Sequence, residues 1–494
     1  MNAMSRKQLG MKKYVFAAIT CLTTTVGSAQ PANAIQAQAA DFWRAATQAD
    51  IEAAYTLIEK NHPGVLPEIG DTAFRAALET AHTTARARAL EVTSFEGYTA
   101  TLAAFGVALG DKHIGSRPLY APIRVDWSGL ITSKRGDRWI VVDEEETPSV
   151  PSVKGAQLIS CDGRPAEDLA RTSLGVFRVD WSVEAQQIQA APWLLVDEHN
   201  PFISRPKICE FDKAGQHVTL TLPWCQTARS ALTQKFIAAI GAGSAGFGVR
   251  PVGDGWWIAL QSLTDRAGPV VADVVANAQK LRKAKFVVLD LRGNGGGSST
   301  FGDQIARALM GDDYVSHILG PGGNDCGDVW RVSEDNIRQM KYYVDTLGPT
   351  RGADFEREMV KQLARAEEAR AAGRPLSGPL TCHTRVGRAS PRPRSRLDGR
   401  LIVITDHLCF SSCLEVTKAF LDLGALHVGQ TTDANTHYTE NRDEALPSGL
   451  SRFSTQQAIS PSAPLRYGPF VPAVAYDGNI ADTAELERWV IGLR

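Results

Sequence analysis

Two continuous apolar runs, each followed by a break and then by a helical pattern, organise the second half of the sequence. The first run covers residues 286–291 and is typical of a strand buried on both faces. A cluster of glycines follows at residues 293–297, and residues 300–310 then show the spacing of a helix. Glycine adopts backbone angles that other residues avoid, and free N–H groups at such a turn can hold an oxyanion.

The second run covers residues 401–405, is interrupted at residues 406–410 and is followed by another predicted helix, which ends at Gly424. The apolar positions of that helix are Cys413, Val416, Phe420 and Leu423. Ser411 and Ser412 stand at its first turn, where a serine serves either as a helix cap or as a nucleophile. Considered alone, these serines favour the capping role, because serine is a preferred residue there.

The rest of the chain divides by the period of its apolar positions. Residues 41–108 have helical periodicity and predict a small helical domain, whereas residues 122–225 have the alternation typical of strands. Strand and helix patterns alternate from residue 247 onward, which predicts a parallel or mixed sheet. Residues 328–398, between the two apolar runs, contain two further helical patterns and are expected to form either a lid or a dimer contact.

The N-terminus has the pattern of a secretory signal peptide. Basic side chains precede an apolar run over residues 14–26, and small residues follow, with candidate cleavage sites after Ala29 and Ala34. The apolar run is short for a membrane span, and the alternative is a short buried helix. We therefore expect residues 1–34 to be removed and the protein to be secreted or periplasmic, with no membrane association after cleavage.

Composition excludes some partners and directs attention to the cysteines. The chain has 494 residues, enough for roughly two to four domains, and a net charge of −1, which favours neither nucleic acid nor an anionic membrane. Of the eight cysteines, Cys21 lies in the predicted signal peptide, and export makes the remaining seven candidates for disulfides. A bridge between Cys209 and Cys225 would close a predicted hairpin, and one between Cys326 and Cys382 would close the base of the helical insertion. The sequence lacks zinc-type ligand spacing, so we expect no metal and no cofactor.

The glycine turn and the serine helix together resemble the serine peptidase superfamily of C-terminal-processing proteases, tricorn protease and interphotoreceptor retinoid-binding protein. Residues 290–297 match its Asp-Leu-Arg-Gly-Asn-x-Gly-Gly turn, and residues 412–415 match its Ser-x-x-Glu stretch. The resemblance implies an α/β fold with a crotonase/ClpP-like spiral core of β-β-α units over residues 230–494. It also implies an N-terminal helical domain at residues 40–115 and an inserted PDZ-like β-rich domain at residues 120–228.

The resemblance further implies a set of catalytic residues. Asp111-x-His113 matches a motif of the tricorn and retinoid-binding branch, in which the histidine is the general base. Ser412 is then the expected nucleophile, with Ser411 and Ser298 as rivals, because Ser412 has the three-residue spacing to the glutamate. Glu440 is the candidate acid that orients the base. The expected oxyanion donors are the N–H groups of Cys413 and of either Gly296 or Gly297.

Two features separate this chain from other branches of the superfamily. A catalytic lysine is expected 25 residues after the nucleophile in the C-terminal-processing branch, but His437 stands at that position, and no lysine follows Lys418. A Ser/Lys dyad is therefore excluded. Lys112 stands where tricorn protease has a serine next to its histidine. Residues 153–165 resemble a PDZ domain, although a β-domain with a tight Asp-Gly turn explains them equally well.

The predicted function is that of an exported serine-type endopeptidase acting on a peptide or protein substrate. The alternatives are an inactive relative that binds a small apolar ligand or peptide, an esterase with the same triad, and a scaffold for other exported proteins. The presence of the candidate serine, histidine and glycine turn disfavours pure binding. Homo-oligomerisation is left open.

Overall fold

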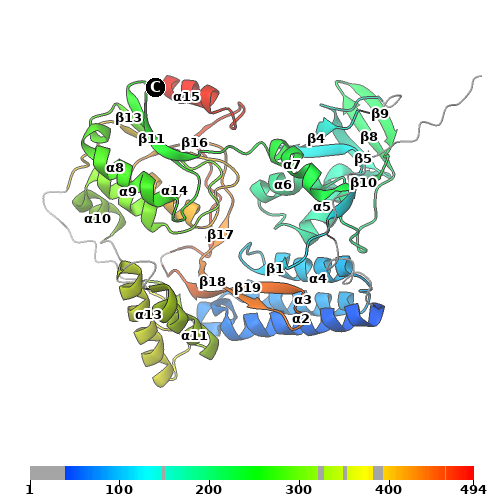
Figure 1. Cartoon of the computed structure of the whole chain (residues 1–494), viewed down its shortest axis with the longest axis horizontal. Coiled ribbons are helices and arrows are strands. Elements are labelled where there is room, and N and C mark those ends of the chain that lie inside the picture. The colour runs from blue at the N-terminus through cyan, green and yellow to red at the C-terminus, as the bar shows by residue number, and fades with distance from the viewer. Residues whose placement is uncertain are drawn as a thin grey trace, which may run out of the picture.

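The structure is a computed structural model that describes residues 39–146, 151–320, 327–348, 353–381, 393–461 and 463–493. The predicted signal peptide at residues 1–34 and the predicted Cys326–Cys382 bridge lie outside these residues. Figure 1 shows N-terminal helices along one side of the molecule, an α/β core above one end of them and a β-rich region above the other. No helix in the described part of the chain combines the length and apolar composition needed to span a bilayer.

A six-stranded sheet forms the centre of the α/β core, and its strand order is β11-β12-β13-β15-β16-β21. These strands are β11 (Phe247–Val252), β12 (Gly255–Leu260), β13 (Phe286–Asp290), β15 (Arg400–Thr405), β16 (Leu426–Gly429) and β21 (Val474–Ala475). Strands β12 to β21 run parallel, and β11 is antiparallel to β12. The two apolar runs are therefore the neighbouring strands β13 and β15, as their burial pattern requires.

Alternate residues of β13 bury their side chains on opposite faces of this sheet. Val287 and Leu289 pack with α8 (Ala267–Arg282), α9 (Thr300–Met310) and α14 (Ser412–Asp422). Val288 packs on the other face, with α15 (Thr483–Gly492). The result is a mixed α/β fold with helices on both faces of a largely parallel sheet, as predicted at this coarse level.

The N-terminal helices pack against a hairpin from the far end of the chain. They are α2 (Ala40–Asn61), α3 (Thr72–Ala89) and α4 (Phe95–Val107), with the short helices η1 (Pro63–Val65) and η2 (Pro67–Ile69) between α2 and α3. Their core includes Phe453, from the hairpin of β18 (Tyr438–Ala445) and β19 (Ser451–Ile459). Strand β19 also pairs with β1 (Gly115–Pro118) and β14 (Val329–Trp330). The loop between α4 and β1, which contains His113, is thus held between helices and hairpin.

The β-rich region is built on a second sheet, of order β3-β4-β5-β8-β9 with β6 paired to β5. Its strands are β3 (Leu130–Arg135), β4 (Arg138–Glu144), β5 (Gln157–Cys161), β6 (Arg164–Pro165), β8 (Ile208–Lys213) and β9 (Gln216–Thr221). Around it lie β2 (Arg124–Trp127), β7 (Val196–Asp197), β10 (Cys225–Ala228), α5 (Ala166–Phe177), α6 (Glu184–Ala190), η3 (Ala191–Trp193), η4 (Arg229–Leu232) and α7 (Thr233–Ile240). Asp162 and Gly163 both have positive φ, which makes the tight Asp-Gly turn between β5 and β6.

The predicted Cys209–Cys225 disulfide is wrong. Cys209 on β8 bonds instead to Cys161 on β5, because these two residues are directly opposed in the ladder and their Cα atoms are 4.0 Å apart. A second bridge joins Cys409 and Cys413. The spacing of two cysteines along a predicted hairpin does not reveal which further strand pairs with that hairpin.

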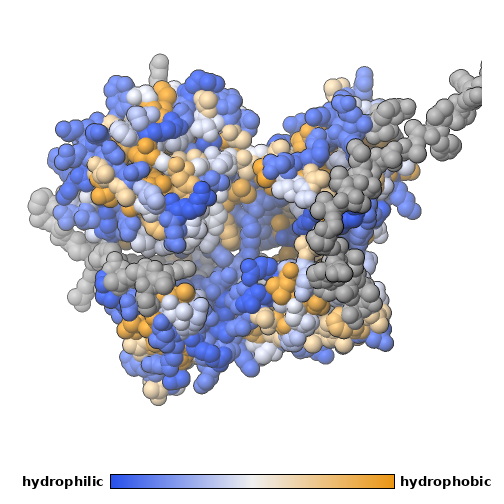
Figure 2. Space-filling view, viewed as in Figure 1, coloured by the Kyte–Doolittle hydropathy of each residue, from blue (hydrophilic) through white to orange (hydrophobic). Residues whose placement is uncertain are grey.

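Helices make up much of the described part of the segment between α9 and β15. It contains α10 (Asp312–Leu319), α11 (Glu334–Tyr342), which continues as a π-helical turn (Tyr343–Leu347), and α13 (Ala353–Ala371). Ile337, Met340 and Ala366 of these helices pack on Trp330 and Ala458. Figure 2 shows hydrophilic residues over most of the visible face of the molecule, with hydrophobic patches scattered between them.

Replacing Arg292 by Leu should lower the free energy of unfolding by about 3–5 kcal/mol, because it leaves a buried carboxylate without its partner. The Arg292 and Asp290 side chains are both fully buried, with 2.7 Å between Nη2 and Oδ2. Urea unfolding followed by tryptophan fluorescence measures the change. Arg250→Leu is the matched control, because its ion pair with Glu487 is half exposed and should contribute less than about 1 kcal/mol. Equal losses in the two variants would contradict the prediction.

Candidate active site

The turn between β15 and α14 places a serine in an unusual backbone conformation. Ser411 immediately precedes α14 and has φ 58° and ψ −132°, a region that non-glycine residues rarely occupy. Such residues cost about 1–3 kcal/mol and occur mainly at functional sites. A sharp strand-to-helix turn of this kind presents the serine Oγ at the N-terminal end of a helix, where the helix dipole favours negative charge.

Ser411 is in hydrogen-bond contact with the predicted base. The Nε2 atom of His113 lies 3.1 Å from Ser411 Oγ, and its Nδ1 atom lies 3.0 Å from Oδ1 of Asp111. The other carboxylate oxygen of Asp111 accepts a hydrogen bond from the hydroxyl of Thr436. Serine, histidine and aspartate thus form a continuous chain, although Ser411 and His113 are far apart in the sequence.

Asp111 is buried, but its carboxyl stays ionised. Burial raises the pKa of this group, whereas hydrogen bonds from His113 and Thr436 lower it, and the net result is a pKa below the usual value. A negative charge at this position favours the Nδ1-protonated form of the His113 ring, which leaves Nε2 free to accept the proton of Ser411.

Ser412, the serine preferred from the sequence, has its hydroxyl bonded to another group than His113. Its hydroxyl donates a hydrogen bond to the carbonyl oxygen of Gly297, with an O···O distance of 2.8 Å. Ser412 is the first residue of α14, so its backbone is helical and differs from that of Ser411. The geometry therefore favours Ser411, which the sequence had placed second because it lacks the three-residue spacing to Glu415.

Glu440, the predicted orienting acid, is not bonded to the His113 ring, because Asp111 and Ser411 occupy the two ring nitrogens. Glu440 lies on β18, where its carbonyl accepts a hydrogen bond from Gln457 and its charge acts on Asp328. Asp111 takes the position expected for it. The motif that identified the histidine already contained this acid, two residues earlier.

The expected oxyanion donors are only partly available. The N–H of Gly296 donates to Asn294 Oδ1, and that of Cys413 donates to the Phe410 carbonyl. The N–H groups of Gly297 and Ser412 have no acceptor in the described part of the chain. These two N–H groups are therefore the better candidates to hold an oxyanion.

The glycine turn packs directly against the serine turn. A Cβ atom on Gly296 would lie 2.8 Å from Ser411 Cβ, and one on Gly297 would lie 2.0 Å from the Leu263 carbonyl oxygen. Both glycines also have positive φ, so side chains there would be strained as well as crowded. These positions need glycine because two backbones meet at the candidate site.

A buried carboxylate fixes the two turns together. Asp406, at the end of β15, accepts hydrogen bonds from the N–H groups of Gly243, Gly293 and Leu408. Burial raises its pKa to about 6, although those N–H groups oppose the shift. The N–H of Phe410 in turn donates to the Asn294 carbonyl at 3.2 Å, which is a direct bond between the turns.

A second carboxylate connects the serine turn to the β-rich region. Asp433 is fully buried and accepts hydrogen bonds from Lys112, Gln186 and Gln189, the last two on α6. The Lys112 ammonium also lies 4.8 Å from the centre of the Phe410 ring. Lys112 therefore contributes to packing beside His113, at the position where tricorn protease has a serine.

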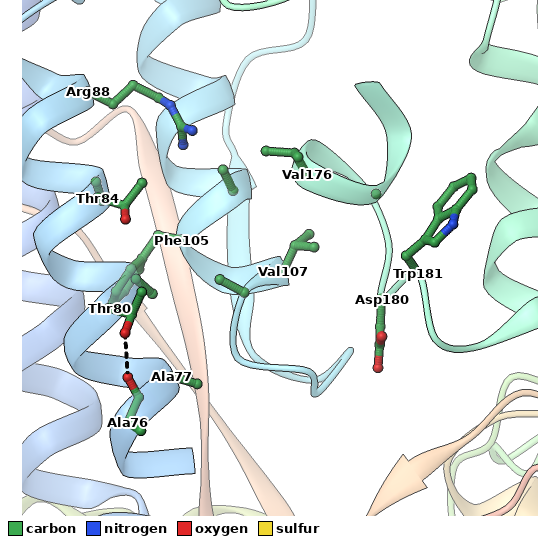
Figure 3. Close-up of a pocket in the computed structure, with 15 residues that line it drawn as sticks. Ala76, Ala77, Thr80, Thr84, Arg88, Phe105, Val107, Val176, Asp180 and Trp181 are labelled. Atoms are coloured by element: carbon green, nitrogen blue, oxygen red, sulfur yellow. Dashed lines mark hydrogen bonds between the residues drawn. The ribbon is translucent and has the colours of Figure 1, made fainter. Parts of the chain in front are cut away.

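A groove of about 510 Å³ runs between α3 and α4 on one side and α5 on the other. Figure 3 shows Thr84, Arg88 and Val107 on one wall, with Val176 and Trp181 opposite them. Six of the fifteen residues that line it are alanines, and Arg88 and Asp180 contribute one charge of each sign. The groove passes Ala108, three residues before Asp111.

Comparison with known proteins identifies a family for the part of the chain that carries the glycine turn and the serine turn. Residues 257–462 match the model of peptidase family S41. The chain contains an S41 peptidase domain. The predicted resemblance is thereby confirmed at the level of the family, and an S41 domain indicates a hydrolase of the peptidase class. No curated protein sequence matches the chain.

Solved structures share the fold over nearly the whole chain. Mature CPAF has a TM-score of 0.55 and 16% identity and covers 91% of this chain and 97% of its own, and mature CPAF complexed with lactacystin has a TM-score of 0.56 and 15% identity, with 91% and 98% covered. The tricorn protease structure also matches, with a TM-score of 0.35, 10% identity and 91% and 37% covered. At these identities the CPAF likeness shows a shared fold and no more.

The charge of Asp328 should make stability depend on pH. Burial of its carboxyl, with the negative charges of Glu440 and Glu415, raises its pKa to about 8, against about 3.9 for an unfolded aspartate. The folded state therefore keeps a proton that the unfolded state releases, and the free energy of unfolding falls as the pH rises from about 4 to about 8.

Asp328→Asn should remove this dependence. We expect its melting temperature to exceed that of the parent protein at pH 8, with the difference shrinking towards pH 5, when both are followed by circular dichroism. Asp273→Asn, at an exposed position of α8, is the control and should change the melting temperature equally little at both pH values. A pH-independent difference for Asp328→Asn would contradict the expectation.

Proposed function

We propose that this protein is a serine peptidase in which Ser411 is the nucleophile, His113 the general base and Asp111 the orienting acid. The observation that carries the proposal is the 3.1 Å contact between His113 Nε2 and Ser411 Oγ, combined with the strained backbone of Ser411. The match to peptidase family S41 supports peptide-bond hydrolysis as the class of reaction. A serine hydroxyl is a weak nucleophile at neutral pH, and a base within hydrogen-bond reach is what activates it.

In the proposed reaction, Ser411 Oγ attacks the carbonyl carbon of the substrate while its proton moves to His113 Nε2. Asp111 stabilises the imidazolium that forms. The N–H groups of Ser412 and Gly297 hold the oxyanion, aided by the N-terminus of α14. His113 then gives its proton to the leaving amine, and a water molecule, deprotonated by His113, hydrolyses the acyl-enzyme.

Peptides or proteins are the proposed substrates. The crotonase-like description of the core and the PDZ-like description of the β-rich region belong to this proposal, with that region presenting the substrate. The groove beside α4 offers a path towards the loop that contains His113. Export is proposed as well, and the Cys161–Cys209 and Cys409–Cys413 bridges support it, because disulfides persist in oxidising compartments.

The test is labelling of the purified protein with a serine-directed phosphonate probe. Ser411→Ala should abolish labelling and lower kcat by about 10⁶-fold, as loss of the serine does in other triads. Ser412→Ala should still be labelled, because its hydroxyl faces the Gly297 carbonyl. Lactacystin, bound in one CPAF structure, provides a second probe for the same comparison. Labelling lost in Ser412→Ala but kept in Ser411→Ala would reverse the assignment, and an unlabelled parent protein would refute the proposal.

The acid is tested separately. Asp111→Asn should lower kcat by about 10⁴-fold, because the ring loses the charge that fixes its tautomer. Glu440→Gln is the matched control and should retain activity, since Glu440 is not bonded to the ring. Measurement of kcat on a peptide substrate discriminates the two acids. Loss of activity in Glu440→Gln with an active Asp111→Asn would restore the sequence-based choice.

A further inference from the structure

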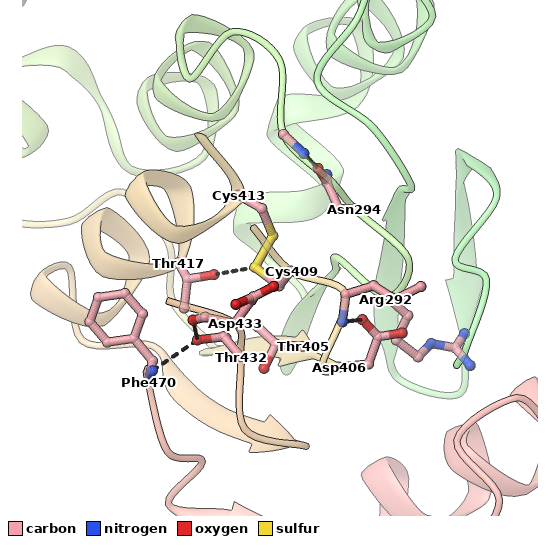
Figure 4. Close-up of a disulfide and its surroundings, with 12 residues drawn as sticks. Arg292, Asn294, Thr405, Asp406, Cys409, Cys413, Thr417, Thr432, Asp433 and Phe470 are labelled. Carbon is pink, nitrogen blue, oxygen red and sulfur yellow. Dashed lines mark hydrogen bonds between the residues drawn. A yellow bond between two sulfur atoms is a disulfide. The ribbon is translucent and has the colours of Figure 1, made fainter. Parts of the chain in front are cut away.

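The Cys409–Cys413 disulfide spans the candidate nucleophile. Cys409 lies in the turn after β15, Cys413 is the second residue of α14, and Ser411 is midway between them. The Cα atoms of the two cysteines are 5.4 Å apart, and both residues are fully buried. Figure 4 shows the bridge between the helix and the loop, with Thr417 and Asp433 beside it.

Each end of this small ring is anchored in the protein. The carbonyl of Cys409 accepts a hydrogen bond from the N–H of Asp433, and the sulfur of Cys409 lies 3.5 Å from the hydroxyl of Thr417. Cys413 packs in the main core with Leu414 and Val416. The residues between the cysteines, by contrast, are partly exposed. The covalent bond therefore holds an exposed turn between two fixed points.

Ser411 needs such support. Its backbone conformation is one that the local chain does not favour, and it is maintained only where the surroundings over-determine it. Without the bridge, the turn that holds the serine keeps only noncovalent restraints, among them the 2.8 Å hydrogen bond from the N–H of Leu414 to the Ser411 carbonyl. A relaxed turn would move Oγ away from His113 Nε2.

The size of the ring points to local positioning rather than to overall stability. The two cysteines are 4 residues apart, whereas Cys161 and Cys209 are 48 apart. Closing a longer loop removes more freedom from the unfolded chain, so the Cys161–Cys209 bridge has the larger entropic effect on stability. The short bridge mainly restrains the residues inside it.

We propose that the Cys409–Cys413 disulfide positions Ser411 for proton transfer to His113, so that activity depends on oxidation of this pair. Reduction by a dithiol breaks the S–S bond, leaves two thiols on the enzyme and oxidises the dithiol to its cyclic disulfide. Reoxidation re-forms the bond and restores the serine. The cysteines are positioning residues, and the inference rests on the proposed function of Ser411.

The test compares two double variants, so that no unpaired thiol remains. Cys409→Ala with Cys413→Ala should lower kcat by about tenfold to a hundredfold, because small misplacements of reacting groups cost that much, while KM changes little. The rate of phosphonate labelling should fall in parallel. Cys161→Ala with Cys209→Ala is the control, and its kcat should stay close to that of the parent protein. Circular dichroism checks the fold of each variant.

Reduction provides an independent measurement. In the Cys161→Ala/Cys209→Ala protein, dithiothreitol should lower kcat, and removal of the reductant with reoxidation should restore it. In the Cys409→Ala/Cys413→Ala protein, the same treatment should leave kcat unchanged. Because Cys225 is disulfide-bonded as well, mass spectrometry of the same samples identifies the opened bridges, and the fall in kcat must follow opening of the Cys409–Cys413 bridge.

The outcomes separate the two proposals. An unlabelled parent protein refutes the assignment of Ser411 itself. A labelled parent protein with equal kcat in the Cys409→Ala/Cys413→Ala variant, or with kcat insensitive to reduction when mass spectrometry shows this bridge open, overturns the positioning role and leaves the serine assignment intact.

Discussion

The parallel pairing of β13 with β15 is the constraint on which the candidate site depends. Asp290 on β13 is opposite Ile404 on β15, so both strands end at the same edge of the sheet. Parallel strands present the loops at their carboxyl ends to a common crevice. The glycine turn and the serine turn therefore meet, although the helical insertion separates them in sequence, and the Asp406 carboxylate fixes one against the other.

His113, the proposed base, reaches this crevice from a separate part of the chain. The loop that holds His113 is fixed by strand β1 and by the Ser454 hydroxyl, which donates to the His113 carbonyl at 2.6 Å. Thr436 restrains the Asp111 carboxylate from the opposite side. Ser454 and Thr436 both follow α14 in sequence, so the last part of the chain completes a candidate site whose proposed base lies near the beginning of the chain.

Asp433 connects the serine turn to the β-rich region by hydrogen bonds. Its buried carboxylate joins Gln186 and Gln189 of α6 to Lys112, and its N–H donates to the Cys409 carbonyl. These hydrogen bonds connect α6 both to Lys112, next to His113, and to the serine turn. This physical connection relates a region expected to present substrate to the atoms expected to react with it.

Much of this arrangement was predictable because it depends on local sequence patterns. An apolar run of strand length that ends in glycines can be buried in few ways, so β13 and α9 were predicted closely from periodicity. The Asp-x-His motif identified His113, and it contained Asp111 as well. The order of the motifs along the chain also predicted the family and the coarse fold. That order is informative because packing requires each turn to lie at the end of a particular strand.

The choice between Ser411 and Ser412 required the tertiary structure. The two residues are chemically identical neighbours, and they differ in backbone conformation and in what each hydroxyl faces, which local sequence does not encode. The choice of the acid and the pairing of the cysteines also required the tertiary structure. Glu440 has a carboxylate, but it is the Asp111 carboxylate that contacts the His113 ring. Cys209 bonds to Cys161 because β5 pairs with β8. By itself the sequence predicted the main strands and helices, the resemblance to the family and His113 as the candidate base. The folded chain decided which groups touch, since contacts between distant segments depend on strand pairing and loop geometry together.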